Sequence, residues 1–300
     1  MRVRAAAFGL VATVTTLTLA ACASSSGGGT GDGLSVVTST NVYGQIASVI
    51  GADRVDVTSI ISDPSADPHS YEANTRTQLE LSEADVVIEN GGGYDDFVNT
   101  MLSGENSHAV VLNAVELGGH AKDVDLNEHV WYDFPSMGKL VTRLVSVLSA
   151  ADPAGAATYE ANGAAFQQQL GRLESTEAAI KQAHAGVGVA ITEPVPLYLL
   201  HAAGLVDKTP AQFSEAVEEG TDVSPLVLKR TTDLFDRRQV AALVYNEQTS
   251  GPETEQVRKA AEANDIPALG VSETLPAGKT YLTWMGDNLA VISQALDGAS

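Results

Sequence analysis

The chain has 300 residues, enough for one large domain or two of ordinary size, and its 44% hydrophobic content excludes wholesale disorder. Its 17 Lys and Arg stand against 38 Asp and Glu, and this net charge of −21 excludes nucleic-acid binding and attraction of a basic face to anionic lipid. The single cysteine excludes an internal disulfide and a thiolate cluster for iron–sulfur or structural zinc.

The N-terminus has the pattern of an export signal that ends at a cysteine. Arg2 and Arg4 precede an apolar run, diluted by threonines, that is too short for a comfortable transmembrane span. The run ends in Leu-Ala-Ala before Cys22, and a Ser/Gly-rich stretch follows. This pattern resembles a bacterial lipobox, which predicts a signal peptide over 1–21, lipidation of Cys22 and a tether over 22–33. The alternative is an ordinary signal peptide with an incidental cysteine.

Short β-branched runs then alternate with amphipathic segments as far as residue 151. Such alternation is typical of parallel βαβ units. It predicts an N-terminal lobe over 34–152. The predicted strands are 34–39, 55–61, 86–89 and 110–112, and the predicted helices are 42–50, 75–84, 94–102 and 131–151.

The next segment, 153–185, is predicted to be one long linking helix. Pro153 suits a first helical turn, and Gly186 and Gly188 end a run that contains no other proline. A helix of about 32 residues spans roughly 48 Å, which is longer than a small domain needs. No heptad of apolar positions is sustained, so a coiled coil is excluded. A rigid backbone helix that joins two lobes is the better interpretation.

The alternation of strands and helices resumes over 186–300, which is predicted to be the C-terminal lobe. The sequence therefore predicts an α/β protein with two Rossmann-like βα lobes, joined by the long helix. The predicted strands are 188–192, 240–246 and 268–271, and the predicted helices are 196–203, 225–235, 253–264 and 281–296.

Four candidate metal ligands follow predicted strands, where functional residues of open α/β sheets gather. They are His69, His129, Glu193 and Glu273, two from each lobe. Pro68 restricts the backbone just before His69, as suits a ligand that must be held in place. Two imidazoles and two carboxylates can neutralise a divalent cation and fill its inner shell from opposite walls of a cleft. The alternatives are solvated surface side chains and, for Glu193, a cap on the following helix.

The remaining histidines are interpreted as ordinary surface or helix residues. His184 lies near a helix C-terminus, where a partial positive charge is favourable. Only His120, in the short segment 118–125, is also a candidate accessory residue for metal capture. His108 and His201 are given no role.

The segments around His69 and His129 resemble the zinc/manganese solute-binding lipoproteins that feed bacterial metal ABC importers. The strongest marks are Asp-Pro-His-Ser-Tyr-Glu at 67–72 and His-Val-Trp-Tyr-Asp at 129–133, spaced as that family spaces its first two metal histidines. Asn90-Gly91 and the long helix fit the same pattern, and the resemblance extends from about Leu34 to Leu296.

The resemblance implies a role for each candidate. His69 and His129 match the ligands of the first lobe. Glu193 matches a position that holds His in many zinc binders and Glu in many manganese binders. Glu273 stands where that family usually has Asp, and because of this departure Glu247 is kept as the reserve fourth ligand. The sequence lacks the long His-rich loop of several zinc binders.

The function implied is that of an extracytoplasmic binding protein, not an enzyme. It would capture Zn²⁺ or Mn²⁺ as its transported ligand in the cleft between the lobes and deliver it to the membrane permease of an ABC importer. We expect a monomer, lipid-anchored on the outer face of the bacterial cytoplasmic membrane, with no nucleic-acid partner. The alternatives are a metal-dependent hydrolase that uses the same cleft and a surface adhesin. No Ser/His/Asp set or His-Glu-x-x-His helix is found to support the hydrolase, and no motif supports the adhesin.

Overall fold

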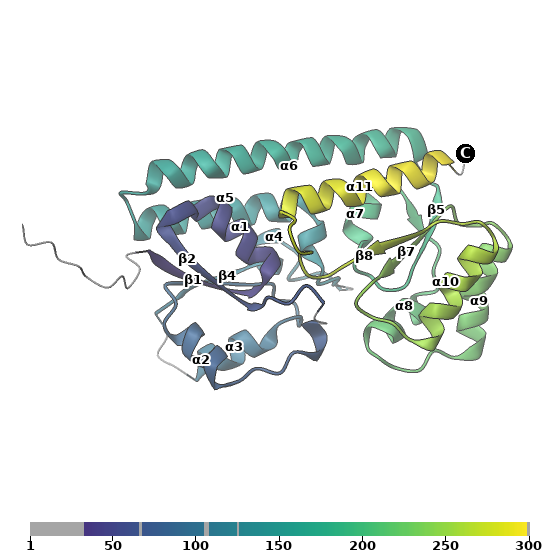
Figure 1. The fold of residues 1–300 in the computed structure, drawn as a ribbon, viewed down its shortest axis with the longest axis horizontal. Coiled ribbons are helices and arrows are strands. Elements are labelled where there is room, and N and C mark those ends of the chain that lie inside the picture. The colour runs from purple at the N-terminus through teal and green to yellow at the C-terminus, as the bar shows by residue number, and fades with distance from the viewer. Residues whose placement is uncertain (1–32, 66–67, 105–107, 125, 299–300) are drawn as a thin grey trace, which may run out of the picture. The chain divides into compact units, whose positions relative to one another are not determined.

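The computed structural model describes residues 33–298 apart from 66–67, 105–107 and 125. The predicted signal peptide, Cys22 and nearly all of the predicted tether lie outside the described residues. The remainder contains two four-stranded sheets, and all of the strand pairs are parallel. The predicted α/β architecture of two βα lobes is therefore confirmed (Figure 1).

The first sheet has the strand order β2-β1-β3-β4, with Val36 of the central strand beside Val57 and Val86. Helices α1 and α5 cover one face of this sheet, and α2 and α3 cover the other. The strands are rich in valine and isoleucine because both faces are buried. The elements of this lobe are β1 (Leu34–Thr40), α1 (Asn41–Gly51), β2 (Val55–Ile61), α2 (Thr75–Ser82), β3 (Val86–Glu89), α3 (Asp96–Ser103), β4 (Val110–Asn113), α4 (Ala114–Gly118) and α5 (Phe134–Ala151).

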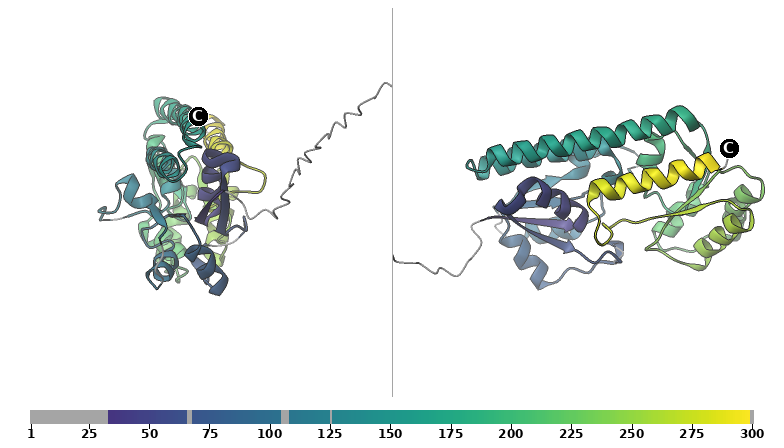
Figure 2. Two further views of the ribbon diagram at one scale, coloured as in Figure 1. Left: turned by 90° about the vertical axis from the view of Figure 1, so that its left-hand side faces the viewer. Right: turned by 45° about the horizontal axis from the view of Figure 1, so that its top comes forward.

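The long helix α6 (Ala156–His184) has 29 residues and packs on both lobes. It contacts α1 and α5 of the first lobe and α7 and α11 of the second, and Figure 2 shows it running alongside α11. Its start is fixed by Asp152, which accepts hydrogen bonds from Arg54 (2.7 Å) and from the hydroxyl of Tyr159 (2.8 Å). The helix begins three residues after Pro153, because residues 153–155 form a turn first.

The second sheet has the order β6-β5-β7-β8, so its four strands are arranged as in the first sheet. Helices α8, α9 and α10 pack on one face of this sheet, whereas α7 and α11 pack on the face that α6 also covers. The elements are β5 (Gly188–Ile191), α7 (Leu197–Ala202), β6 (Val206–Asp207), α8 (Ala211–Glu218), α9 (Pro225–Asp236), β7 (Leu243–Asn246), α10 (Pro252–Ala263), β8 (Ala268–Val271) and α11 (Tyr281–Gly298).

The structure corrects several predicted elements. The helix predicted over 131–151 is interrupted: Val130–Tyr132 forms a separate 3-10 turn, and α5 starts at Phe134. The reason is Asp133, whose carboxylate caps the backbone N–H of Ser136 at 3.0 Å and sets a new helix start. The elements α4, β6 and α8 were not predicted, and each has at most eight residues.

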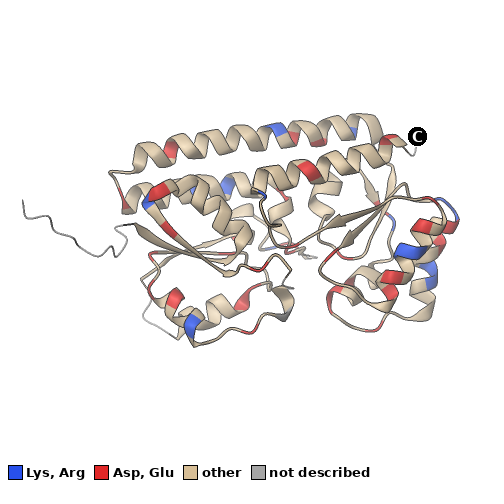
Figure 3. Cartoon of the chain, in the orientation of Figure 1, with Lys and Arg blue, Asp and Glu red and all other residues tan. Residues whose placement is uncertain are grey.

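The charged side chains are spread unevenly over the described residues. Acidic side chains occur on both lobes, whereas most basic residues of the second lobe lie on α9, directly after α9, or on α10 (Figure 3). None of the helices between residues 33 and 298 is both long enough and apolar enough to span a bilayer.

Candidate metal centre

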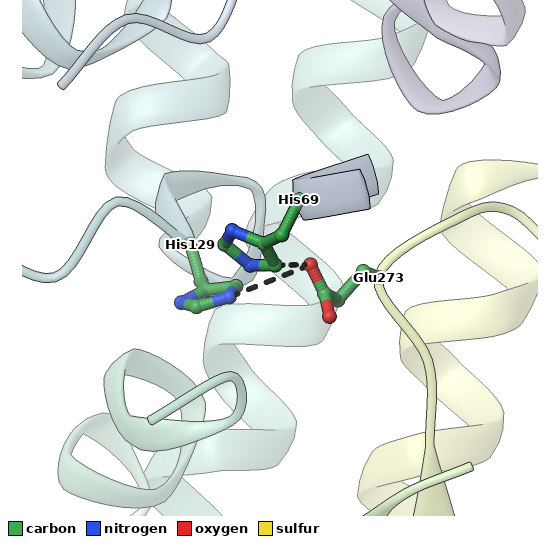
Figure 4. Close-up of side chains that lie close together, drawn as sticks. All are labelled: His69, His129 and Glu273. Atoms are coloured by element: carbon green, nitrogen blue, oxygen red, sulfur yellow. Dashed lines mark ion pairs between the residues drawn. The ribbon is translucent and has the colours of Figure 1, made fainter. Parts of the chain in front are cut away.

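His69, His129 and Glu273 meet between the two lobes (Figure 4). The Nε2 atoms of His69 and His129 lie 3.3 and 3.7 Å from the same carboxylate oxygen, Oε2 of Glu273. One ligand atom from each residue lies within 4.8 Å of the other two. Because a transition-metal ion takes such ligands at about 2.0–2.2 Å, these separations suit three donors around one ion. The arrangement can therefore bind a divalent cation with two nitrogens and a carboxylate.

The first-lobe histidines are held by the turns that precede and follow them. His69 lies in a 3-10 turn, Pro68–Ser70, directly after the loop that leaves β2, and its ring packs edge-on against Tyr94 at 5.2 Å. The segment before His129 is held by Asn90, whose side-chain amide donates to the backbone oxygen of Glu128 at 2.9 Å. The chain therefore presents both imidazoles from loops whose positions are fixed by neighbouring contacts.

Asn90 is itself placed by a tight turn after β3. The carboxylate of Asp95 accepts hydrogen bonds from the backbone N–H groups of Asn90 (2.6 Å) and Gly91 (2.8 Å). Gly91 has φ of +80°, and a Cβ there would come within 2.2 Å of Asn113. Both the backbone conformation and the lack of space require glycine at this position.

His129 is fully buried, and its hydrogen bonds define which nitrogen is free for a metal. Nδ1 lies 2.7 Å from Oδ1 of Asn127, and the amide nitrogen of Asn127 donates to the backbone oxygen of Pro194 at 3.1 Å. Since the Asn127 oxygen only accepts, Nδ1 carries the proton of the neutral ring, and the lone pair of that neutral ring lies on Nε2. Nε2 is buried, faces Glu273 and has no hydrogen-bond partner among the described residues. A cation would satisfy it.

Glu273 is fully buried and receives donors on both oxygens. The Tyr94 hydroxyl donates to Oε2 at 3.1 Å, and the side-chain amide of Asn246 donates to Oε1 at 2.8 Å. Burial on its own would raise the pKa of Glu273, but His129 and His69 outweigh burial and lower the pKa below its usual range. Burial would lower the pKa of His129, but Glu273 raises it above its usual value. A bound cation would replace the proton that this pairing favours.

Glu193 lies next to this group without being part of it. The Asn246 amide that donates to Glu273 also donates to Oε2 of Glu193 at 2.5 Å, so one amide links the two carboxylates. Oε1 of Glu193 is buried and has no hydrogen-bond partner within the described part of the chain. Burial, with repulsion from Glu273, raises the pKa of Glu193. The capping alternative is not what the structure has, because α7 begins without a side-chain cap.

Glu247, the reserve fourth ligand, and His120, the accessory candidate, are not part of the group formed by His69, His129 and Glu273. Glu247 is exposed, and its carboxylate lies against Gly270 and away from the two histidines. The two ring nitrogens of His120 have different partners, Asp123 at 2.8 Å on Nδ1 and Ser136 at 3.2 Å on Nε2.

Among the other histidines, His184 bonds with Asp297 at 3.0 Å. His108 and His201 are exposed. None of these three belongs to a described group of potential metal ligands.

Several residues of the site were not identified from the sequence. Asn246 ends β7 at the same sheet edge as the ligands, so the strand-end rule that selected the four candidates could have found it. Glu128, which directly precedes His129 in the sequence, was not selected as a candidate ligand either. Glu218 ends α8, a helix absent from the prediction, and its Oε1 lies 3.8 Å from Nδ1 of His129. Burial raises the pKa of Glu218 to about 7.

Two parallel α/β lobes spanned by one long helix, with imidazoles and carboxylates from both lobes meeting between them, define a two-lobed α/β binding protein. The family described as "zinc-uptake complex component A periplasmic" matches residues 36–295, and the chain belongs to this family. The resemblance seen in the sequence is thereby confirmed.

Two individual relatives and one solved structure are similar to this chain. The manganese-binding lipoprotein MntA of Halalkalibacterium halodurans is 30% identical over 148 residues, 48% of each chain, so this chain spans about half the length of that relative. The manganese ABC transporter substrate-binding lipoprotein PsaA of Streptococcus pneumoniae is 22% identical over 289 residues, 89% of this chain and 90% of that protein. The periplasmic zinc-binding protein TroA of Treponema pallidum has the same fold, with a TM-score of 0.72 at 21% identity over 88% of this chain and 99% of that one.

Proposed function

We propose that this chain captures Zn²⁺ or Mn²⁺ outside the cytoplasmic membrane and delivers it to the permease of a metal ABC importer. The observation that carries the proposal is the group of His69, His129 and Glu273, which brings two nitrogens and a carboxylate together between the lobes. Relatives that match 89% and 48% of the chain are named as a manganese ABC transporter substrate-binding lipoprotein and a manganese-binding lipoprotein. A site shared by two lobes suits a carrier, because relative movement of the lobes would release the cargo.

We assign Glu193 as the fourth ligand, with Glu273 preferred to Glu247. Oε1 of Glu193 is a buried acceptor with no hydrogen-bond partner in the described structure, and a cation would supply one. Glu247 is exposed on the other side of its strand end. We keep His120 as an accessory residue for metal capture, with Nδ1 paired to Asp123 and Nε2, which lies 3.2 Å from the Ser136 hydroxyl, as the atom that would reach a metal ion.

Capture and release, not catalysis, is the role we propose for this site. Two imidazoles and two carboxylates close a tetrahedral shell, whereas a catalytic metal keeps a position open for water or substrate. In the part of the chain that the structure describes, no comparable group of residues favours the adhesin alternative.

The N-terminal segment would direct export of the protein and its attachment to the membrane. We propose cleavage after residue 21, lipidation of Cys22, and residues 22–33 as a tether that leaves a monomeric binding protein on the outer face of the membrane. A thioether-linked diacylglycerol supplies two acyl chains, which is enough for stable attachment. The relatives named above as lipoproteins support this assignment.

Thermal unfolding with and without metal tests the ligand assignment. A ligand at 1,000 times its Kd adds about 4 kcal/mol, which should raise the Tm of a protein this size by several degrees or more. We expect His69→Ala and His129→Ala each to remove most of the rise produced by Zn²⁺ or Mn²⁺. His201→Ala is the control, because His201 is exposed on α7. Equal losses in all three variants, or none in the first two, would contradict the assignment.

A further inference from the structure

A second group of potential ligands shares His69 with the metal centre. One ligand atom from each of His69, Glu128 and Glu218 lies within 4.8 Å of the other two. Glu128 belongs to the first lobe, and Glu218 is the last residue of α8 in the second. Like the first group, this one is assembled from both lobes.

The second group is closer to solvent than the first. The side chains of His129 and Glu273 are 0% exposed, whereas that of Glu218 is 18% exposed and Glu128 is half-buried. His69, which belongs to both groups, has a side chain that is 27% exposed. The order of exposure places Glu128 and Glu218 on the solvent side of the buried pair.

Within the described residues, no lysine or arginine forms an ion pair with either Glu128 or Glu218. The ion pairs found among the described residues connect Glu218 only with His129 and include none for Glu128. Oε1 of Glu218 is also buried, and no described residue hydrogen-bonds to it. Two carboxylates around one imidazole are a donor set that suits a divalent cation, and a hard one such as Mn²⁺ in particular.

From this geometry we propose that His69, Glu128 and Glu218 form an outer divalent-cation site through which metal enters the buried centre. The inference rests on the proposed function of His69, His129 and Glu273 as the final binding position. Because both groups use His69, the ion stays bound to one imidazole while the two outer carboxylates give way to His129 and Glu273. The outer site is the weaker of the two, since it is more exposed and has one imidazole where the inner one has two.

Equilibrium binding tests the outer site directly once the inner one is disabled. In a His129→Ala, Glu273→Gln background, Mn²⁺ titrated by electron paramagnetic resonance should still bind weakly. Adding Glu218→Gln or Glu128→Gln should weaken that binding by about tenfold or more, because each removes a charged ligand. Glu215→Gln is the matched control, since Glu215 is exposed on the same helix. Residual binding that is the same with and without Glu218→Gln would overturn the proposal.

Kinetics test whether the outer site lies on the path of entry. Trp131 lies 5.1 Å from the ring of His129, centroid to centroid, and provides a fluorescence signal for occupation of the inner centre. In the otherwise wild-type protein, Glu128→Gln with Glu218→Gln should slow both association and dissociation of Zn²⁺ by roughly fivefold or more, which leaves the affinity nearly unchanged. Unchanged rates would overturn the proposal.

An affinity loss as large as that of His129→Ala would also overturn it, because it would make these carboxylates ligands of the inner ion. If the wild-type protein bound no metal tightly, the proposed function itself would fail, which is a distinguishable result.

Discussion

Glu177, on the helix that links the lobes, gives a sharp test of how that helix is packed. Its side chain faces inward from α6, and the residue is 5% exposed. Burial raises its pKa from 4.5 to about 8, and repulsion from Asp133 and Glu174 acts in the same direction. The folded protein therefore keeps a proton on Glu177 at pH values where the unfolded chain has lost it.

The sign and size of the effect follow from this difference in pKa. Between the two pKa values the folded state binds more protons than the unfolded state, so the contribution of Glu177 to stability falls as pH rises. It is fully present below the unfolded pKa of 4.5 and lost as pH rises to about 8. At ~1.4 kcal/mol for each unit of this pKa difference, the upper limit of the stability change is ~5 kcal/mol. Because water penetrates at the edge of the helix and screens the charge, we expect a change of about 1–3 kcal/mol.

The change to test is Glu177→Gln, which replaces the carboxyl by a neutral group of the same shape. We expect its free energy of unfolding in urea to match that of wild type near about pH 4.5 and to exceed it by about 1–3 kcal/mol at about pH 8. The protein must be metal-free, because metal binding adds its own pH dependence. Glu160→Gln is the control, since Glu160 is exposed on the same helix and is not among the groups that raise the pKa of Glu177. A Glu177→Gln difference that does not change with pH would refute the reasoning, as would an equal effect of the control.

Three further predictions concern the metal and the anchor. Glu193→His should raise the Zn²⁺/Mn²⁺ affinity ratio by about tenfold, because a third imidazole suits Zn²⁺; an unchanged ratio in competition titrations would remove Glu193 from the ligand set. Lowering the pH should weaken metal binding measured by calorimetry, and the loss should begin above the range of an ordinary imidazole, because the pKa of His129 is raised. Cys22→Ala should release the protein from membranes in a fractionation experiment, and a variant that stays bound would contradict the lipobox interpretation.

Seven of the eight strands in the described part of the chain could be predicted, because each of the seven carries its own local signal. A parallel strand that is buried on both faces needs a continuous run of β-branched or aliphatic residues. The predicted bounds of β2, β3 and β8 coincide with those in the structure. Strand β6 has only two residues, too few for any periodicity to be visible, and it is held in place by pairing with β5.

For the candidate ligands, local sequence signals were not sufficient to predict which side chains face the centre. Glu247 and Glu273 both lie at the carboxyl end of a strand, so strand position alone does not distinguish them. Successive residues of a strand point to opposite sides, and the structure has Asn246 buried and Glu247 exposed. The inward position at the end of β7 is therefore occupied by an amide, and the carboxylate beside it faces away. Which of the two neighbours faces the centre depends on register, which the sequence did not reveal.

Outer residues such as Glu218 could not be predicted for a different reason. Glu218 approaches His129 only because α8 ends there, and 89 residues of sequence separate the two. No spacing within the chain encodes that approach. It follows from the packing of α8 against the second sheet, where Phe213 lies in the same apolar cluster as Phe235.

The donors around Glu273 also explain how the group of His69, His129 and Glu273 is held in place. Glu273 is held by the Tyr94 hydroxyl, the Asn246 amide and two imidazoles, and its ion pairs among the described residues are with histidine alone. A lysine or arginine in that place would neutralise the charge of the carboxylate, and an incoming cation would have to displace it. Neutral hydroxyl and amide donors contribute only partial charges, so a divalent cation gains most of the electrostatic attraction of the site when it binds. Asn246 links the two carboxylates that we propose as ligands, because its single amide donates to both Glu193 and Glu273.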